Sequence, residues 1–213
     1  MSDVLFYFAL LLGCFPIFLL KIKAKSTDSL KYPIAPFLWL VFFSSVYEYV
    51  GTDLFQITSS YWFKLYSLLE FVTLAYFFYQ LLQKKYKSYF LVFSIIYLVL
   101  FSIILIYWDE STRFKTDSYL SLIEIVLVYF FTIVWLKNIF SNSSEYNFVQ
   151  TSNFYFISGI VLYLSGTFFL YLLGDSILKD EKLNLEDFWI LNIVFNIILR
   201  IFLILGVWKI QQK

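Results

Sequence analysis

The sequence predicts an all-α fold, a polytopic membrane bundle of seven transmembrane helices in a single domain, residues 1–213. Apolar residues make up 61% of the chain, charged residues make up 15%, and the mean hydropathy is +0.78. Soluble domains have roughly 45–50% apolar and about 25% charged residues, so the chain lies outside that class. The apolar residues also form long continuous segments that short polar loops separate.

Each apolar segment is long enough to cross about 30 Å of hydrocarbon at a rise of ~1.5 Å per residue. The first two are the shortest, and Pro16, Pro33 and Pro36 fall in them or at their entrances, where proline starts or kinks a helix. Short connections make consecutive helices antiparallel neighbours, and tyrosine and tryptophan at segment ends fit interfacial belts. The predicted helices lie near residues 4–20, 33–50, 61–82, 88–108, 118–139, 152–174 and 187–208.

The lysines and arginines of the loops predict the orientation. One set of loops and ends carries ten of them and the alternate set carries four. The positive-inside rule then places the N-terminus outside and the C-terminus in the cytoplasm. An excess of lysine over arginine, with much Ile, Phe, Tyr and Asn, suits an AT-rich genome, so we expect a multi-pass protein of a bacterial inner (cytoplasmic) membrane. The ten are Lys21, Lys23, Lys25, Lys31, Lys84, Lys85, Lys87, Lys137, Lys209 and Lys213, and the four are Arg113, Lys115, Lys179 and Lys182.

Composition also excludes several kinds of chemistry. The net charge of +1 gives no case for nucleic acid as a partner. Histidine is absent and Cys14 is the single cysteine, which excludes His-based zinc sites, Ser–His and Cys–His catalysis and internal disulfides. We therefore expect no enzyme, no metal and no cofactor. Leu11-Leu12-Gly13-Cys14 resembles a lipobox, but no basic residue precedes it and the apolar stretch continues to Leu20, so a small residue within a membrane helix is the better interpretation.

Four ionisable residues lie inside these apolar stretches: Glu48, Glu70, Glu124 and Arg200. Each such group costs roughly 2.5–3.5 kcal/mol on insertion scales, so it usually has a reason to be there. Glu48 lies within a turn of the outer end of its helix. Helix geometry places Glu124 ~9 Å, Glu70 ~14 Å and Arg200 ~20 Å from the outer ends of theirs. The polar residues therefore gather in the outer half of the bundle.

The last predicted helix carries a polar stripe, because Asn192, Asn196 and Arg200 recur at i, i+4 and i+8. Lipid offers polar groups no partner, so they must face one another or water. We expect an outward-facing pocket that binds a small polar or cationic ligand. Its predicted lining is Glu48, Tyr66, Glu70, Glu124, Asn192, Asn196 and Arg200.

Within that pocket Arg200 is expected to pair with Glu70, with Glu124 as the second candidate, because a guanidinium binds a carboxylate bidentately. The same residues could instead form an interhelical clamp without a ligand, or a proton or ion pathway. The apolar inner half argues against a continuous pathway. Lys64 lies close to the outer interface, where snorkelling explains it.

Two further patterns concern an internal repeat and helix packing. Residues 67–70 (Ser-Leu-Leu-Glu) resemble residues 121–124 (Ser-Leu-Ile-Glu), and either a duplicated two-helix hairpin or chance similarity explains this resemblance. Gly159 and Gly166, each preceded by a serine, lie seven residues apart on one face, where small residues let helices approach closely.

Residues 67–71, 159–167 and 189–192, leading to Trp208-Lys209, resemble segments of small seven-helix membrane proteins of the Bacteroidetes type; the resemblance covers residues 61–208. It implies a sensory role with coupling to a histidine kinase. We therefore expect a receptor-like protein that signals through a separate membrane protein partner. The alternatives are a structural or assembly subunit of a membrane complex and a small-solute transporter. SWEET-type carriers share the helix count, but they have prolines in both halves and this chain has none after Pro36.

Overall fold

The computed structural model describes residues 2–23, 32–57, 60–82, 86–107, 113–142, 148–179 and 185–210, which are helical and include no strand. A π-helix, η2 (Glu48–Leu54), continues α2, and a 3₁₀ helix, η5 (Phe148–Gln150), precedes α6. The α-helices are α1 (Ser2–Lys23), α2 (Ala35–Tyr47), α3 (Ser60–Leu82), α4 (Lys87–Ile106), α5 (Arg113–Asn142), α6 (Ser152–Lys179) and α7 (Leu185–Trp208).

The all-α prediction is confirmed, and six of these helices are long and apolar enough to cross a membrane, which supports a multi-pass membrane protein. The second predicted span, near residues 33–50, is the exception. Pro36 lies in the first turn of α2, where a missing N–H is tolerated, but α2 ends after 13 residues and passes into η2. The six stretches are Val4–Lys23, Trp62–Leu82, Lys87–Ile106, Thr116–Ser141, Ser152–Gly174 and Trp189–Trp208.

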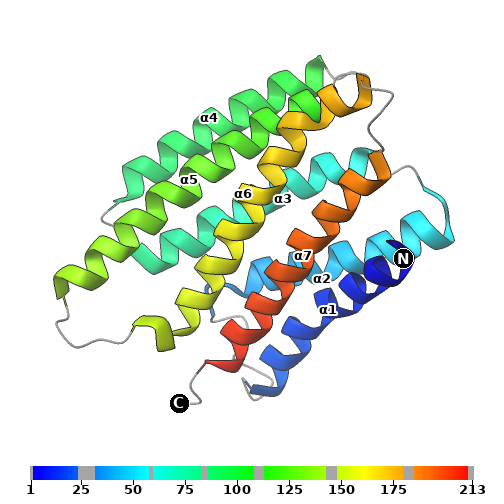
Figure 1. Cartoon of the computed structure of the whole chain (residues 1–213). Helices are drawn as coiled ribbons and strands as arrows, with labels where there is room; N and C mark the ends of the chain where they lie inside the picture. The colour runs from blue at the N-terminus through cyan, green and yellow to red at the C-terminus, as the bar shows by residue number, and fades with distance from the viewer. Residues whose placement is uncertain are drawn as a thin grey trace.

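Consecutive helices alternate in direction, so the bundle has two ends (Figure 1). We call one the amino-terminal end, where α1, α3, α5 and α7 begin. The opposite end, where these four helices finish, is the lysine-rich end. There the Nζ of Lys23 donates to the carbonyl of Trp208 and lies 4.9 Å from the centre of its ring, which ties α1 to α7. The described lysines near this end are Lys21, Lys23, Lys87, Lys137 and Lys209.

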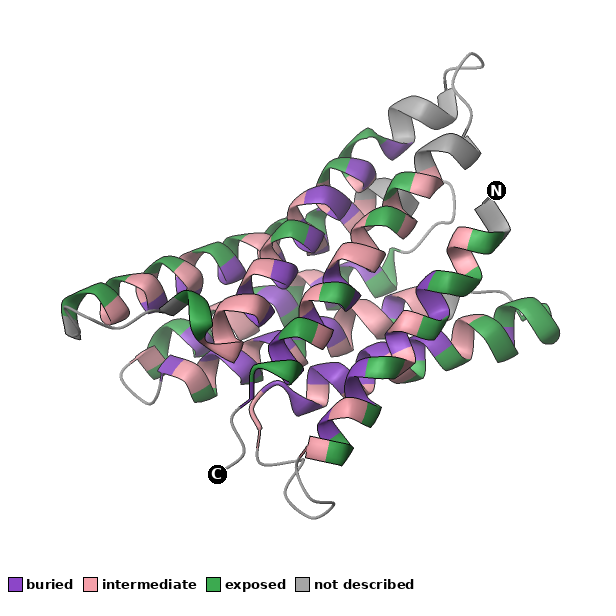
Figure 2. Ribbon diagram, turned by 60° about the horizontal axis from the view of Figure 1, so that its bottom comes forward, coloured by how far each residue is buried: buried purple, intermediate pink, exposed green. Residues whose placement is uncertain are grey.

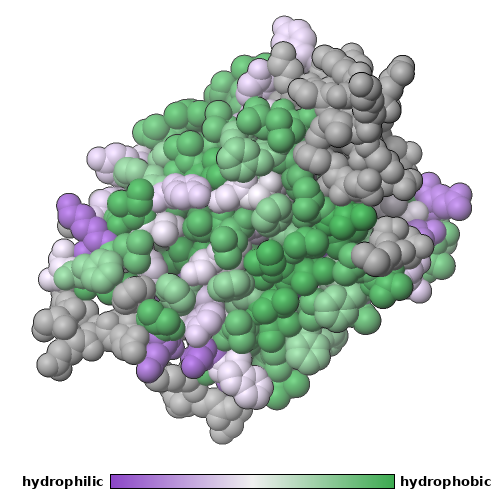
Figure 3. Space-filling model, in the orientation of Figure 1, coloured by the Kyte–Doolittle hydropathy of each residue, from purple (hydrophilic) through white to green (hydrophobic). Residues whose placement is uncertain are grey.

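Six helices form a closed ring in the order α1, α2, α3, α5, α6, α7, and α7 returns to α1. The helix α4 lies outside this ring and packs against α3 and α5 (Figure 1). Its buried residues, Phe90, Tyr97, Phe101 and Ile104, follow one helix face, and its remaining apolar surface is exposed. Exposed residues run along the outer faces of the other helices too (Figure 2), and much of the face seen in Figure 3 is apolar. Such a surface suits lipid as the surrounding solvent.

Aromatic rings fill the ring of helices toward the lysine-rich end. Phe131 of α5 stacks on Phe90 of α4, with ring centres 3.9 Å apart, and also lies beside Phe78 of α3. Phe77 of α3 meets Phe156 of α6 edge to face. Four of these side chains are at most 2% exposed, and Phe90 is 7% exposed. This half of the bundle is a close-packed plug.

The helices α6 and α7 approach closely at glycines. A Cβ on Gly159 would overlap Phe202, a Cβ on Gly166 would overlap Phe195, and a Cβ on Gly206 would overlap Phe156. The prediction that the small residues of the sixth helix allow close packing is therefore confirmed.

Candidate functional site

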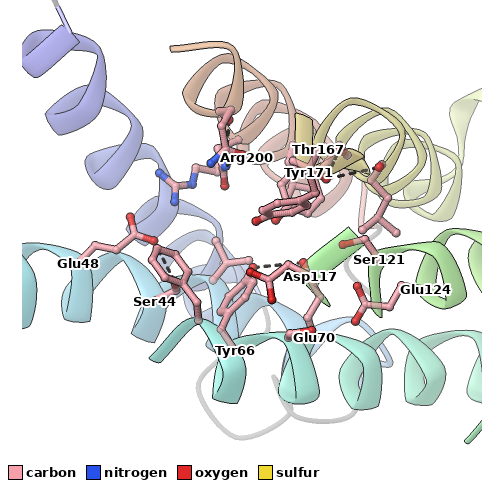
Figure 4. Close-up of a pocket in the computed structure, with 18 residues that line it drawn as sticks. Ser44, Glu48, Tyr66, Glu70, Asp117, Ser121, Glu124, Thr167, Tyr171 and Arg200 are labelled. Carbon is pink, nitrogen blue, oxygen red and sulfur yellow. Dashed lines mark hydrogen bonds between the residues drawn. The ribbon is translucent and has the colours of Figure 1, made fainter. Parts of the chain in front are cut away.

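One pocket brings together the seven residues that the sequence predicts as the lining of a ligand pocket. Residues of α2, η2, α3, α5, α6 and α7 line it (Figure 4), and they extend from the middle of these helices toward the amino-terminal end. Its cavity encloses about 70 Å³. A water molecule needs ~10–15 Å³ on this measure, so the cavity has room for several waters or one small solute. The predicted residues in its lining are Glu48, Tyr66, Glu70, Glu124, Asn192, Asn196 and Arg200.

The stripe on α7 forms one wall, and part of its hydrogen bonding is internal. The Nδ2 of Asn196 donates to the carbonyl oxygen of Asn192 at 3.0 Å and lies 3.4 Å from its side-chain oxygen. This pairing follows from the i, i+4 spacing, which stacks the two amides on one face. Asn192 and Asn196 therefore act as a unit beside Arg200.

Glu48 enters the pocket at the junction between α2 and η2. It is the first residue of the π-helix, and Ser44, one turn earlier, donates a hydrogen bond to its Oε1 at 3.2 Å. π-helical turns are frequent at functional sites because they change the direction of side chains locally. The ring of Tyr47 faces away to stack on Trp62, with ring centres 4.3 Å apart.

Glu70 and Glu124 lie on the parallel helices α3 and α5 and are 5% and 2% exposed. Hydroxyl groups supply the hydrogen bonds of Glu70: Tyr66 donates to its Oε1 at 3.3 Å, and Tyr163 of α6 donates as well. The hydroxyl of Tyr97 on α4 lies beside the Glu124 carboxyl group, donates to the carbonyl oxygen of Ser67 at 2.9 Å and lies 2.9 Å from the Ser67 hydroxyl. The Oε1 of Glu124 has no hydrogen-bond partner among the described residues.

The expected ion pair between Arg200 and Glu70 is not formed, and Glu124 does not pair with Arg200 either. Among the described residues, Nε and Nη1 of Arg200 have no hydrogen-bond partner, although the side chain is only 4% exposed. The guanidinium points toward Glu48 and α1, whereas Glu70 and Glu124 lie on the other side of the pocket (Figure 4).

The reason is local packing. Gly13 of α1 leaves room for the guanidinium: a Cβ there would lie 3.2 Å from Cζ of Arg200 and would overlap the hydroxyl of Ser45. The side chain of Arg200 fills this space on the α1 side of α7. Tyrosine hydroxyls meanwhile supply hydrogen bonds to Glu70, so the acidic and basic groups of the pocket stay apart.

Lys64 does not extend its ammonium group to the interface, as the snorkelling interpretation expected. Its side chain is buried, and its Nζ forms an ion pair with Asp117 and a 3.2 Å hydrogen bond to the hydroxyl of Thr116. This pair joins α3 to α5 near the amino-terminal end, and Asp117 itself lines the pocket. Asp117 falls one residue before the predicted fifth helix, so the sequence alone places it in a loop and gives no sign that it lines the pocket.

Sequence reasoning also missed the tyrosines of the interior. Tyr97 and Tyr163 lie near the middle of α4 and α6, so their depth along the helix could have separated them from interfacial tyrosines. The expected interfacial belts of tyrosine and tryptophan concern the ends of the segments and say nothing of tyrosines in the middle of a helix. Tyr171, Ser121 and Thr167 complete the polar lining, and the Thr167 hydroxyl donates to the Tyr163 carbonyl at 2.9 Å.

The described residues include no group of three or more His, Cys, Asp or Glu side chains that could hold a metal ion. What the pocket offers is hydrogen bonding and charge: one guanidinium on one side, two buried carboxyl groups on the other, and amides and hydroxyls between them. A comparison with protein-family models, curated proteins and solved structures finds no match.

Proposed function

We propose that this protein is a receptor-like membrane protein whose pocket takes a small polar or cationic solute from outside the cell and whose signal passes to a separate protein. In this proposal α2 and η2 together complete a seventh crossing. The amino-terminal end faces outward and the lysine-rich end faces the cytoplasm of a bacterium, following the positive-inside rule.

One observation carries the proposal: among the described residues, three buried polar atoms of the pocket have no hydrogen-bond partner. The Nε and Nη1 of Arg200 and the Oε1 of Glu124 belong to the lining of one cavity. Leaving a buried donor or acceptor unpaired costs roughly 1–3 kcal/mol, and more for charged groups. An interhelical clamp would use these atoms to join helices, whereas here they remain available to a bound solute.

The aromatic plug argues for binding over transport. A transported solute would have to leave through the half of the bundle that Phe77, Phe78, Phe131 and Phe156 fill, and each of these side chains is at most 2% exposed. Interiors packed at this density leave few voids larger than a water molecule. A pocket closed on one side suits a protein that binds a solute and reports it.

Thiol labelling tests the direction in which the pocket opens. Cys14 is the only cysteine, so a Cys14→Ser chain provides a background free of thiols. In this background an Asn192→Cys variant places one thiol in the pocket lining. We expect a membrane-impermeant maleimide to label it from the extracytoplasmic face only. A matched Thr132→Cys variant in the opposite half should stay unlabelled. Labelling of the first variant from the cytoplasmic face alone would contradict the proposal.

Labelling of the Asn192→Cys variant also identifies solutes that bind in the pocket. Small polar solutes and cations that bind in the pocket should slow labelling of its thiol. Hydrogen exchange of the wild-type chain in nanodiscs should then show solute-dependent protection at the lysine-rich end, where a partner would read the signal. Reconstituted protein that moves a protecting radiolabelled solute across liposomes would replace the receptor proposal with a transporter.

A further inference from the structure

The geometry points to an amphoteric ligand, a small solute with an anionic group at one end and an ammonium group at the other. This inference rests on the proposed ligand pocket and adds the chemical class of its occupant. The anionic end would meet Arg200, and the ammonium end would meet Glu124 and Glu70. The pocket shows the two kinds of group on opposite sides (Figure 4).

The Arg200 side offers donors that nothing in the described chain accepts. Its Nε and Nη1 have no hydrogen-bond partner among the described residues, although the residue is only 4% exposed. Ser45 beside it already donates its hydroxyl proton to the carbonyl of Val41 at 2.9 Å. A guanidinium carries its charge at any accessible pH, and carboxylates are the acceptors that its planar fork fits best.

Glu48 is the other charged group on this side, and it lies within electrostatic range of Arg200. It is only partly buried and accepts a hydrogen bond from Ser44. It balances part of the guanidinium charge in the empty pocket without occupying the two free donors. A ligand carboxylate would therefore compete with Glu48, and removing the charge of Glu48 should strengthen binding of the anionic end.

The opposite side offers acceptors. Glu124 is 2% exposed and its Oε1 has no partner among the described residues, while Glu70 accepts from Tyr66 on its own helix and from Tyr163 on α6. The two carboxyl groups interact electrostatically across the gap between α3 and α5. An ammonium group carries three donors and one positive charge, so it can contact both carboxyl groups at once.

A ligand with a single charge fits this pocket less well. A cation without an anionic end leaves the Arg200 donors unpaired, and an anion without a cationic end leaves the Glu124 acceptor unpaired. Sites built from buried polar groups discriminate strongly against ligands that lack the matching group. The cavity of about 70 Å³ limits the occupant to a few non-hydrogen atoms.

Calorimetric titration of the full chain in nanodiscs tests the inference. The probes are glycine, β-alanine and 4-aminobutyrate, which vary the distance between the charges, with propylamine and propionate as the one-charge analogues of β-alanine. We expect one of the three amphoteric probes to bind at least tenfold more tightly than either analogue. Equal binding of propylamine would overturn the inference and leave the receptor proposal standing with a cationic ligand. Failure of all five probes to bind would also overturn it, while thiol labelling would still decide whether the pocket binds another solute.

Variants of the pocket residues test which residue binds each end of the ligand. In Arg200→Gln the affinity of the best amphoteric probe should fall to that of propylamine, and in Glu124→Gln it should fall to that of propionate. Glu48→Gln should tighten binding of the amphoteric probe. Thr132→Val removes a buried hydroxyl without a partner from the other half of α5 and should leave every affinity unchanged. If the pocket variants fail to fold, as judged by circular dichroism and gel filtration, the five probes on the wild-type chain still decide the outcome.

Discussion

Toward the lysine-rich end, the interior of the bundle consists of aromatic rings such as Phe78 and Phe131 that stack on one another with almost no exposed surface. From the middle of the bundle toward the other end, the same helices bury carboxyl groups, amides and a guanidinium around a cavity. Three of those polar atoms have no hydrogen-bond partner in the described part of the chain. The helices α3, α5, α6 and α7 contribute to both regions. A single scaffold thus carries a rigid half and a polar half.

The difference separates stability from function. Lipid is as apolar as a leucine side chain, so membrane helices associate through close packing and hydrogen bonds rather than through the hydrophobic effect. The aromatic half supplies close packing. In the polar half, unpaired buried atoms lower the free energy of unfolding. Close packing in the aromatic half offsets that loss. Substitutions in the two halves should therefore act on different measurements.

The largest effect is expected in the aromatic half. Phe131→Ala removes a fully buried ring that stacks on Phe90 with ring centres 3.9 Å apart. Loss of a buried Phe side chain typically lowers the free energy of unfolding by roughly 3–5 kcal/mol, because a cavity remains. Reversible unfolding in bicelles should show this loss, with ligand affinity unchanged in the folded protein. A loss below about 1 kcal/mol would show that this half is loosely packed.

The next effect concerns the ion pair at the border of the pocket. Lys64→Met leaves Asp117 without its ammonium partner, and breaking a buried pair costs about 3 kcal/mol or more. The double variant Lys64→Met/Asp117→Leu removes both charges and should recover most of the stability. Unfolding measurements on the two variants test this. Equal stability of Lys64→Met and the wild type would show that the pair is solvated and contributes little.

A smaller effect distinguishes Tyr97 from Arg200. Tyr97→Phe deprives Glu124 and Ser67 of a buried hydroxyl and should cost about 1–3 kcal/mol. Arg200→Leu should leave the unfolding free energy unchanged or raised, because it removes a buried charge with two unpaired donors. Ligand affinity should respond in the opposite sense, with the larger loss in Arg200→Leu. If Arg200→Leu were the more destabilising of the two, the guanidinium would be a structural clamp.

The smallest effect is expected on the lipid-facing surface. The hydroxyls of Tyr129 and Ser165 lie 2.9 Å apart between α5 and α6. Hydrogen bonds between membrane helices average about 0.6 kcal/mol in double-mutant cycles. A cycle of Tyr129→Phe and Ser165→Ala should give a coupling energy of that size. A coupling well above about 2 kcal/mol would place a main contribution to stability outside both halves of the interior.

The depth of a residue along its helix could be predicted from the sequence, but the side chains with which it forms hydrogen bonds or ion pairs could not. The segment boundaries and a rise of ~1.5 Å per residue were enough to predict that Glu70, Glu124 and the α7 stripe lie at depths close enough to meet, and all of them line one pocket. Pairing depends on the rotation of each helix about its own axis. That rotation is set by close contacts such as Gly13 against Ser45 and Arg200, which no periodicity reveals. Tyr97 and Tyr163, which lie beside Glu124 and Glu70, also come from other helices.

Two further differences have physical causes in the chain. The second helix appeared long enough to cross because its apolar residues continue past Tyr47, but backbone pairing changes to the π pattern at Glu48. Lys64 appeared interfacial because its depth is small. Its burial depends on Asp117 of another helix, so only the tertiary structure could show it.

The closure of the ring by α1 and α7 has a consequence for biosynthesis. The helix α1 is synthesised long before α7, and contacts between such distant segments form late. Asn192, Asn196 and Arg200 therefore complete the pocket that Glu70 and Glu124 line only once α7 has been made. A nascent chain that stops before α7 leaves two carboxyl groups facing a gap in its wall. We expect quality-control proteases of the membrane to distinguish such an unfinished chain from the folded protein by these exposed carboxyl groups.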